Sequence, residues 1–370
     1  MQRSQSASSL ATRLKTFRQK LTSKGLDAFL VSCQANRYYL TGWQGDSESG
    51  YLLVTERRAF ILTDSRYTEE VGRRVEGFEL VEYKGRLAEF LGNFFKNQEL
   101  PWVGFESHDL SVFLFKEIKK HARGVKLVPV AHLLEDLRSV KDQEEIKLLK
   151  KSVEIADGAF AFIKNKVKVG MTEAEVAFEI EKFMRSKGAQ KNAWEPFIVA
   201  SGPNSSMVHY AAGGRELRKG DQVLLDWGCV YQGYFCDTSR VLFLGEPNAK
   251  QRQVYNLVLE AQSRGIAKVR AGRRALEVDR QARDFLKEKS KFVFGHGLGH
   301  GVGLEVHEAP RVNEHSTTKL ASGQVITIEP GIYEPGWGGV RLEDMVLVTE
   351  KGCEVLTNAP KELEKVIVKV

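Results

Sequence analysis

Hydrophobic and polar positions in the first third of the chain follow two alternating patterns. Short apolar runs rich in β-branched and aromatic residues, which are typical of strands, are separated by amphipathic stretches that are typical of helices. The predicted strands cover 26–32, 50–54, 59–63, 78–83 and 102–106, and the predicted helices between the later strands cover 65–75 and 85–95. This alternation predicts an α/β domain.

The pattern changes at residue 139. Residues 139–167 form a long, charged helical pattern, which we interpret as the bridge into a second domain. A second helix is predicted over 172–188, where Thr172 and Glu175 have the spacing of a capping box. We therefore predict two domains, 1–138 and 139–370.

The remainder of the second domain is mainly β. Residues 223–244 predict a hairpin that turns at Gly233, and 324–333 and 339–349 predict two further strands. Helical patterns interrupt these β-rich runs near 250–270 and 275–288. We therefore expect a second domain that is mainly β with two further helices.

Composition narrows the class of protein. Of the 370 residues, 42% are hydrophobic and 28% are charged, which describes a soluble globular chain. No apolar run approaches the roughly 18 residues of a membrane helix, so we expect no membrane partner. The four cysteines form no CxxC pair and are too few for a disulfide framework in a chain of this length. We expect a reducing, cytoplasmic compartment.

The net charge of +7 raises the question of a nucleic-acid partner. However, the lysines and arginines are dispersed along the chain, and no dense basic arm or RNA-binding motif accompanies them. Lysine and arginine side chains spread over a solvent-exposed surface explain this charge, so we expect no nucleic-acid partner.

The first 25 residues allow two interpretations. They contain no acidic residue before Asp27 and are rich in Ser and Arg, as in a mitochondrial transit peptide. A structural helix explains the segment as well, because apolar residues recur at helical spacing at Leu10, Leu14, Phe17 and Leu21. The sequence favours the structural helix and leaves the transit peptide open.

A glycine-rich segment, 294–308, carries three histidines. His296 and His300 are four residues apart, as in the helical zinc motif H-E-x-x-H, but the residue after His296 is Gly297 rather than Glu. Glycines also disfavour a helix here, and G-x-G-x-x-G does not occur in the segment. The many glycines indicate that the backbone bends sharply here or that another group approaches it closely. We expect this segment to present its imidazoles, including that of His307, to a binding partner. Histidines scattered on a mobile loop remain the alternative.

Four carboxylates lie in or at the ends of β-rich runs: Asp226, Asp237, Glu329 and Glu343. Asp is depleted in strands, and a buried carboxylate needs a cation or a hydrogen-bond network. Carboxylates with one imidazole suit hard or borderline divalent ions such as Mn²⁺, and two ions can share bridging carboxylates. A strand carboxylate more often faces solvent, however, and spacing alone does not show that the four converge.

Five segments of the second domain carry a family resemblance: 199–210, 224–240, 295–308, 327–333 and 338–357. In this order they resemble the pita-bread-fold metallopeptidases, and specifically the Xaa-Pro aminopeptidase and Xaa-Pro dipeptidase (prolidase) group. The first domain is similar to the creatinase-type N-terminal domain of this group through 36–45, 50–55 and 61–70. The resemblance implies an α/β creatinase-like domain followed by an α+β pita-bread catalytic domain.

The resemblance implies a centre of two divalent metal ions. Asp237 and Glu343 match the carboxylates that bridge both ions, and Asp226 matches a ligand of one ion. His300 and Glu329 match ligands of the other. Mn²⁺ is the expected metal, with Co²⁺, Zn²⁺ and Fe²⁺ as alternatives.

The resemblance also implies residues that contact the substrate. His209 and His307 match histidines that flank the substrate carbonyl without binding metal, and His296 would lie beside the ligands. Arg341 matches a basic residue at the edge of the site, and Arg311 resembles an arginine that binds the substrate carboxylate in some prolidases. Candidate walls of a proline pocket are Phe197 and Tyr210.

Two features depart from the pattern or have no assigned role. The segment 192–197, NAWEPF, is unusual for the group and leaves the shape of the pocket open. Cys229 and Cys236 lie near the first two ligands, and we expect both to be small buried residues. Oxidation sensitivity of the metal site is the alternative for this pair.

The implied activity is that of a metal-dependent exopeptidase. A hydroxide that bridges the two metals would attack the carbonyl carbon of an Xaa-Pro bond in a small peptide, and Glu329 would move the proton. We expect a homodimer. The sequence does not decide whether only dipeptides or also longer peptides are cleaved. It also leaves open the preferred Xaa residue and the native metal.

Other members of the fold give the alternative functions. Creatinase-type amidinohydrolases lack the ligand set that is complete here, and methionine aminopeptidases usually lack the N-terminal domain. A non-catalytic pita-bread protein that binds peptides, histones or RNA remains the alternative from another class. Such proteins typically lose metal ligands, whereas all five positions here hold residues that can bind metal.

Overall fold

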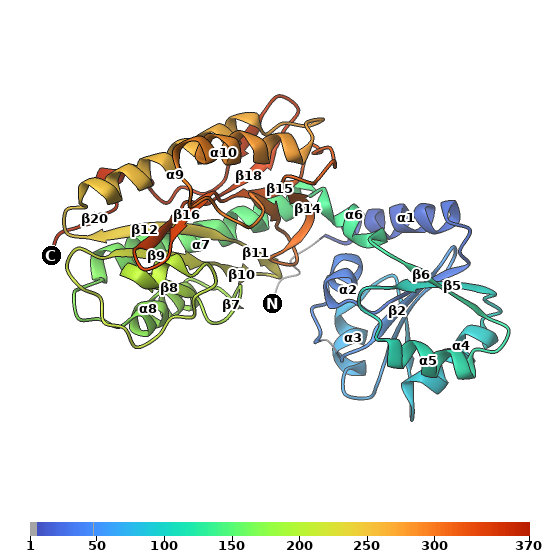
Figure 1. Ribbon diagram of the computed structural model, residues 1–370. Helices are drawn as coiled ribbons and strands as arrows, with labels where there is room; N and C mark the ends of the chain where they lie inside the picture. Colours follow the sequence, from blue (N-terminus) through green and yellow to red (C-terminus); the bar gives the residue numbers. More distant parts are fainter. Residues whose placement is uncertain (1–5, 47) are drawn as a thin grey trace. The chain divides into compact units, whose positions relative to one another are not determined.

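The computed structural model describes residues 6–46 and 48–370. The chain divides into two compact units, Met1–Arg138 and Ser139–Val370, which are called unit 1 and unit 2 below (Figure 1). Among the described residues, no helix combines the length and the apolar character that crossing a bilayer requires.

Unit 1 contains a six-stranded sheet with the order β4-β3-β2-β1-β5-β6. Five of its strands confirm the predicted ones: β1 (Ala28–Val31), β2 (Tyr51–Thr55), β3 (Ala59–Thr63), β4 (Glu79–Glu82) and β5 (Trp102–Glu106). The sixth, β6 (Lys126–Val130), was not predicted; it contains Pro129, a residue that is disfavoured inside a sheet. Proline is tolerated there because β6 lies at the edge of the sheet.

The helices beside this sheet are α1 (Ala7–Ser23), α2 (Gln34–Thr41), α3 (Thr68–Arg74), α4 (Leu87–Asn97) and α5 (Val112–His121), and α6 (Leu133–Ser139) follows β6 and reaches the boundary with unit 2. Helices α4 and α5 pack on one face of the sheet and α1 on the other. Ala28 and Leu30 pack in one core with residues of α4 and α5. Phe29, on the opposite face, meets Phe17 of α1 with ring centroids 5.5 Å apart. Burial of Phe17 confirms the structural helix; residues 1–5, where the segment begins, lie outside the described residues.

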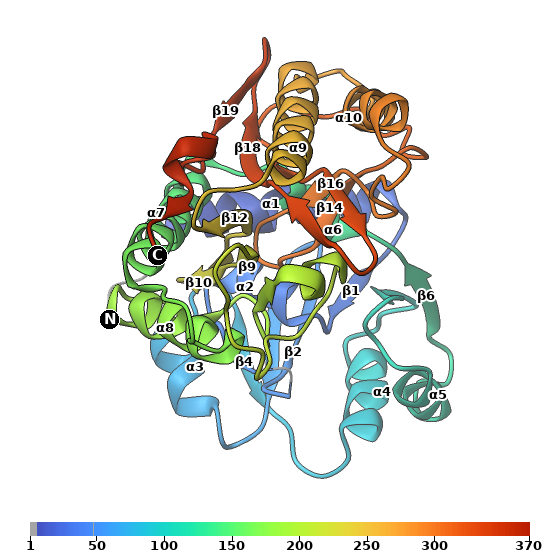
Figure 2. The ribbon, with the colours of Figure 1, turned by 60° about the vertical axis from the view of Figure 1, so that its left-hand side comes forward.

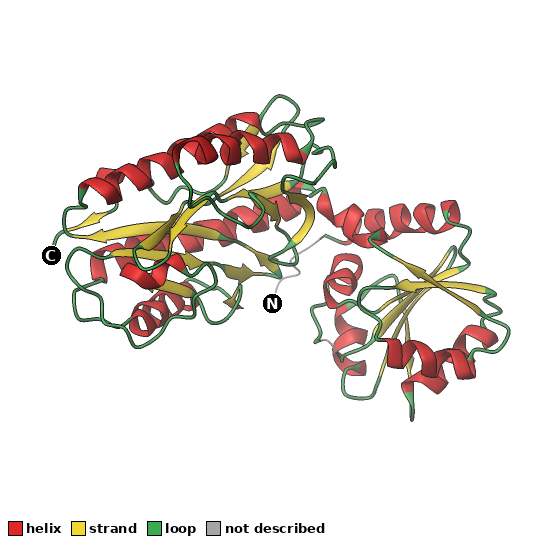
Figure 3. Cartoon of the chain, viewed as in Figure 1, coloured by secondary structure: helices red, strands yellow, loops and turns green. Residues whose placement is uncertain are grey.

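Unit 2 has four long helices: α7 (Gln143–Lys166), α8 (Glu173–Ser186), α9 (Ala249–Lys268) and α10 (Ala275–Lys289). The predicted capping box of α8 is confirmed, because Glu175 N donates to Thr172 Oγ1 at 3.1 Å and Thr172 N donates to Glu175 Oε2 at 2.7 Å. Figure 2 shows α9 and α10 side by side. The strands lie between this pair and the pair α7 and α8 (Figure 3).

The predicted hairpin over 223–244 is confirmed, but it is divided between two sheets. Its outer strands, β9 (Gln222–Trp227) and β12 (Thr238–Leu244), pair in a four-stranded sheet with β8 (Ile198–Ser201) and β20 (Ile367–Val368). Its inner strands, β10 (Cys229–Tyr231) and β11 (Tyr234–Phe235), pair in a small sheet with β7 (Lys191–Asn192). The chain therefore changes sheet near Asp226 and Asp237.

The predicted strands 324–333 and 339–349 are each broken once. The first forms β15 (Val325–Ile328) and β16 (Gly331–Glu334), and the second forms β17 (Gly338–Arg341) and β18 (Asp344–Val348). β15 and β18 belong to a five-stranded sheet with β13 (Gly299–Gly301), β14 (Glu308–Val312) and β19 (Cys353–Val355), whereas β16 and β17 form a separate ribbon. Glu329 and Glu343 lie in the two breaks. Pro330 contributes to the first break because it has no N–H for a ladder.

Candidate metal centre

The five predicted ligands come together in unit 2. Asp226 lies in β9 and His300 in β13, while Asp237, Glu329 and Glu343 lie in the links between strands. Three overlapping groups have ligand atoms within 4.8 Å of one another: Asp237 with His300 and His307, His300 with Glu329 and Glu343, and Asp226 with Asp237 and Glu343. Sequence spacing did not show this convergence.

Glycines on both sides of His300 allow the neighbouring strands to approach. A Cβ at Gly299 would lie 1.9 Å from Thr327 O, and one at Gly301 would lie 2.1 Å from Ala309 O, so any larger residue would clash with backbone. Between them the imidazole of His300 is held against two carboxylates. Its Nε2 is 3.5 Å from Asp237 Oδ2 and 3.4 Å from Glu329 Oε1.

The imidazole of His300 is prepared for metal binding. Its Nδ1 is 3.1 Å from Gly301 O, so a proton on Nδ1 leaves the lone pair of Nε2 facing the carboxylates. Burial, with a smaller contribution from neighbouring His307, lowers the pKa of His300 to about 3. The ring is therefore neutral at pH 7, as a metal ligand must be.

The carboxylates repel one another without a cation. Burial raises the pKa values of Asp237 and Glu343 well above their ordinary range, and the neighbouring carboxylates raise them further. Burial also raises the pKa of Glu329 to about 8. Among the described residues, Asp226 Oδ1 and Glu343 Oε1 are buried without a hydrogen-bond partner. Divalent cations supply both the missing charge and the missing partners, so these residues fit metal ions.

Arg341 holds two of the carboxylates from behind. Its side chain is 2% exposed, and its Nη2 pairs with Asp226 Oδ2. Its Nε donates to Ser239 Oγ at 2.9 Å, and that hydroxyl donates to Glu343 Oε2 at 2.8 Å. Its Nη1 donates to Tyr333 Oη at 2.9 Å. The sequence placed Arg341 only at the edge of the site and missed Ser239, although Ser239 is only two residues from Asp237.

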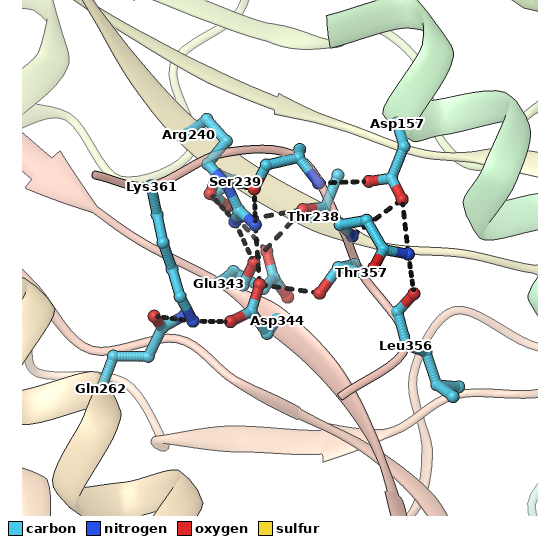
Figure 4. A network of polar contacts seen from close by, with 12 residues as sticks. Asp157, Thr238, Ser239, Arg240, Gln262, Glu343, Asp344, Leu356, Thr357 and Lys361 are labelled. Carbon is cyan, nitrogen blue, oxygen red and sulfur yellow. Dashed lines mark hydrogen bonds and ion pairs between the residues drawn. The ribbon is translucent and has the colours of Figure 1, made fainter. Parts of the chain in front are cut away.

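A second buried network lies behind Glu343 (Figure 4). Asp344 pairs with Arg240 Nη2 at 2.7 Å and with Lys361 Nζ, while Arg240 Nη1 donates to the backbone oxygen of Glu343. Arg240 also donates to Ala359 O in the C-terminal loop. Burial raises the pKa of Asp344, but Arg240 and Lys361 outweigh burial and lower it overall. The network fixes the backbone that carries Glu343.

A cavity of about 500 Å³ opens over the five ligands. Five of the six predicted substrate-side residues line this cavity: His209, Tyr210, His307, Arg311 and Arg341. His296 also lines it; its Nε2 is 3.0 Å from Tyr333 Oη, and burial lowers its pKa to about 4.

Phe197 lies behind the cavity wall. Its side chain is 3% exposed, and its ring packs edge-to-face on Trp194 with centroids 6.1 Å apart. Trp194 is the aromatic residue of the unusual segment 192–197 that lines the cavity. The sequence predicted Phe197 as a wall of the proline pocket, but Trp194 lines the cavity and Phe197 packs behind it.

The ring of His307 stands 4.3 Å from that of His300, at 76°. Burial and nearby Arg311 lower the pKa of His307. Both rings therefore reach the same side of the cavity, and a neutral His307 can donate from one ring nitrogen.

Cys229 lies in β10 and Cys236 directly follows β11. Both are buried, and their sulfurs lie 3.8 Å apart. Both are free thiols in this structure. Their burial agrees with the expectation of small buried residues.

Comparison with known proteins now identifies the family. The family model described as Metallopeptidase family M24 matches residues 147–350. The chain belongs to metallopeptidase family M24. A second model, described as Creatinase/Prolidase N-terminal domain, matches residues 13–140. This M24 chain therefore combines a creatinase-type N-terminal domain with a pita-bread catalytic domain, as the sequence predicted.

Relatives of this M24 chain align over almost its whole length. An Xaa-Pro dipeptidase of Pyrococcus horikoshii is 36% identical over 354 residues, which are 95% of this chain and 98% of that protein. An Xaa-Pro dipeptidase structure from Bacillus anthracis has a TM-score of 0.92 at 38% identity and covers 97% of this chain and 99% of that one. An X-Pro aminopeptidase structure from Thermotoga maritima has a TM-score of 0.86 at 34% identity and covers 95% and 100%.

Proposed function

We propose that this protein is a metal-dependent exopeptidase that cleaves the bond between an N-terminal residue and proline. The buried cluster of four carboxylates and one imidazole, with two orphaned carboxylate oxygens, carries this proposal. Relatives named Xaa-Pro dipeptidase and X-Pro aminopeptidase supply the substrate class.

Five residues would hold two divalent ions: Asp226, Asp237, His300, Glu329 and Glu343. Asp237, His300 and Glu343 each belong to two of the groups whose ligand atoms lie within 4.8 Å. Of these, the carboxylates of Asp237 and Glu343 would be shared by both ions, the role that the family resemblance implies for them. When bound, such a pair lowers the pKa of a shared water and polarises the substrate carbonyl. The predominance of oxygen ligands favours Mn²⁺, with Co²⁺, Zn²⁺ or Fe²⁺ as alternatives.

The other residues of the cavity act on the substrate itself. His209 and His307 would donate hydrogen bonds to the carbonyl oxygen as it becomes negative. Glu329 would accept the proton of the attacking water and deliver it to the prolyl nitrogen as the C–N bond breaks. Tyr210 would form a wall of the proline pocket, and Arg311 would bind a substrate carboxylate. An Xaa-Pro bond has no N–H, so ring recognition must replace backbone pairing.

Three further proposals concern the setting of the enzyme. We propose a homodimer, a cytoplasmic location and small peptides as the partners. The four free cysteines support a reducing compartment. Light scattering on the purified protein tests the oligomeric state.

A substrate panel tests the function. Ala-Pro, Ala-Pro-Ala and Ala-Ala are offered to the metal-loaded enzyme, and release of the N-terminal residue is measured. We expect Ala-Pro to be cleaved far faster than Ala-Ala. Equal turnover of the two would remove the proline specificity and leave a general metallopeptidase. The ratio of Ala-Pro to Ala-Pro-Ala separates a dipeptidase from an aminopeptidase, and an interaction of Arg311 with the free carboxylate would favour Ala-Pro.

A further inference from the structure

A buried carboxylate outside the metal centre, that of Glu173, binds the loop that carries His209. Glu173 is the first residue of α8 and its side chain is 0% exposed. Its Oε1 accepts hydrogen bonds from Ser201 N at 2.7 Å, from Ser201 Oγ at 2.7 Å and from Asn204 Nδ2 at 3.1 Å. Its Oε2 accepts one from Tyr210 Oη at 2.8 Å.

These contacts bracket His209. Ser201 ends β8, Asn204 lies in the 3₁₀ turn that follows, and Tyr210 comes directly after His209. Asn204 Nδ2 also lies 2.9 Å from Tyr210 Oη, so Glu173, Asn204 and Tyr210 close a triangle. One carboxylate therefore fixes the segment on both sides of a histidine that lines the cavity.

Helix capping does not explain this carboxylate. The capping box of α8 is made by Thr172 and Glu175, whose side chains satisfy the first backbone N–H groups. The side chain of Glu173 instead accepts its bonds from the loop. Its place in the first helical turn stabilises its negative charge, and four donors from the loop complete its hydrogen bonding.

We propose that Glu173 is a positioning residue that holds His209 and the ring of Tyr210 in place at the cavity. The proposal rests on the proposed function, in which His209 binds the substrate carbonyl oxygen and Tyr210 bounds the proline pocket. Glu173 does not touch the metal ligands, so its effect is separate from metal binding.

The test compares two neighbouring carboxylates of one helical turn. Glu173→Gln replaces an acceptor of four hydrogen bonds with an amide of the same shape, and Glu175→Gln is the matched control that weakens only the capping box. Each variant is measured for kcat and KM on Ala-Pro, for bound Mn²⁺ and for thermal unfolding. We expect Glu173→Gln to keep the wild-type metal content and lose about tenfold to a hundredfold in kcat/KM, with a raised KM, as hydrogen bonds to a charged group are lost.

The control separates positioning from stability. Glu175→Gln should change kcat/KM by less than about twofold, because the energy of a cap is confined to the helix terminus. If the two variants lose the same activity, or if Glu173→Gln loses metal in parallel with activity, the positioning role is wrong. Failure of the wild-type enzyme to cleave Ala-Pro would instead overturn the proposed function.

A second variant keeps the proposal testable if Glu173→Gln does not fold. Tyr210→Phe removes one hydrogen bond to Glu173 and leaves the ring at the cavity. We expect a raised KM for Ala-Pro with full metal content. If Glu173→Gln does fold, adding Tyr210→Phe to it should raise KM for Ala-Pro by less than about a further twofold, since the two residues act through one contact. An unchanged KM in Tyr210→Phe alone would contradict the proposal.

Discussion

Removing the negative charge of Asp344 should destabilise unit 2 and weaken metal binding. Asp344 is 0% exposed and accepts from Arg240 Nη2 at 2.7 Å and Thr357 Oγ1 at 2.7 Å, besides pairing with Lys361. In Asp344→Asn the shape is kept, but Arg240 and Lys361 lose their counter-charge. Breaking a buried ion pair from one side costs about 3–5 kcal/mol.

The structure places the loss at the lower end of this range. The side chain of Lys361 is 28% exposed and can turn toward water, whereas that of Arg240 is 1% exposed and cannot. We therefore expect a loss of about 3 kcal/mol, which corresponds to a fall in Tm of about 6–12 °C for a unit of this size. Because Arg240 also donates to the backbone oxygen of Glu343, metal affinity should fall about tenfold or more.

Thermal and urea unfolding of the metal-free protein measure the stability, and calorimetric titration with Mn²⁺ measures the affinity. The matched control is Glu364→Gln, which breaks an exposed pair with Arg252 and should cost less than about 1 kcal/mol. If Asp344→Asn is as stable as this control and binds metal as the wild type does, the network does not support Glu343 and the reasoning is wrong.

Two further predictions concern the metal centre. His300→Ala removes a proposed ligand and should lower the metal content, whereas His307→Ala should keep its metal and lose about 10²–10⁴ in kcat. Metal analysis and steady-state kinetics on both variants check this. If His307→Ala loses metal and His300→Ala keeps it, the two roles are exchanged. The pKa of Glu329 rises from the ordinary 4.5 to about 8 on folding, so metal-free protein should lose stability as pH rises from about 4.5 to about 8. Tm is measured from pH 6.5 to 8, above the range where the lowered pKa values of His296 and His300 act. It should fall in the wild type, fall less steeply in Glu329→Gln, where Asp237 and Glu343 still have raised pKa values, and fall least with Mn²⁺ bound. An equal slope in all three would refute the assignment.

Hydrophobic periodicity predicted most helices and strands, because burial of one face sets the pattern in both. It could not show where a strand changes sheet. The runs 324–333 and 339–349 have continuous β character, yet each is broken at a carboxylate that turns toward the cluster. An apolar run looks the same whether it continues in one sheet or crosses into the next. The edge strand β6 was also missed. It contains Pro129, which is acceptable because one side of an edge strand is unpaired, and the sequence does not show which strand lies at the edge.

The chemical types at the site were visible in the sequence, but their arrangement was not. Strand carboxylates and glycine-flanked histidines indicated a metal centre, and the family resemblance supplied the roles proposed for them. The residues that hold this cluster carried no such signal. Ser239 and Asp344 are ordinary polar residues until the fold places one beside Glu343 and the other between Arg240 and Lys361. Which aromatic ring of 192–197 faces the cavity likewise depends on the path of the backbone.

Metal removal and restoration test the central claim most directly. The purified protein is treated with a strong chelator, its metal content is measured, and hydrolysis of Ala-Pro is followed as Mn²⁺ is returned. We expect hydrolysis to vanish with the metal and to return in proportion to bound Mn²⁺, with saturation at about two equivalents per chain. Full hydrolysis of Ala-Pro by protein shown to be free of metal would contradict the account.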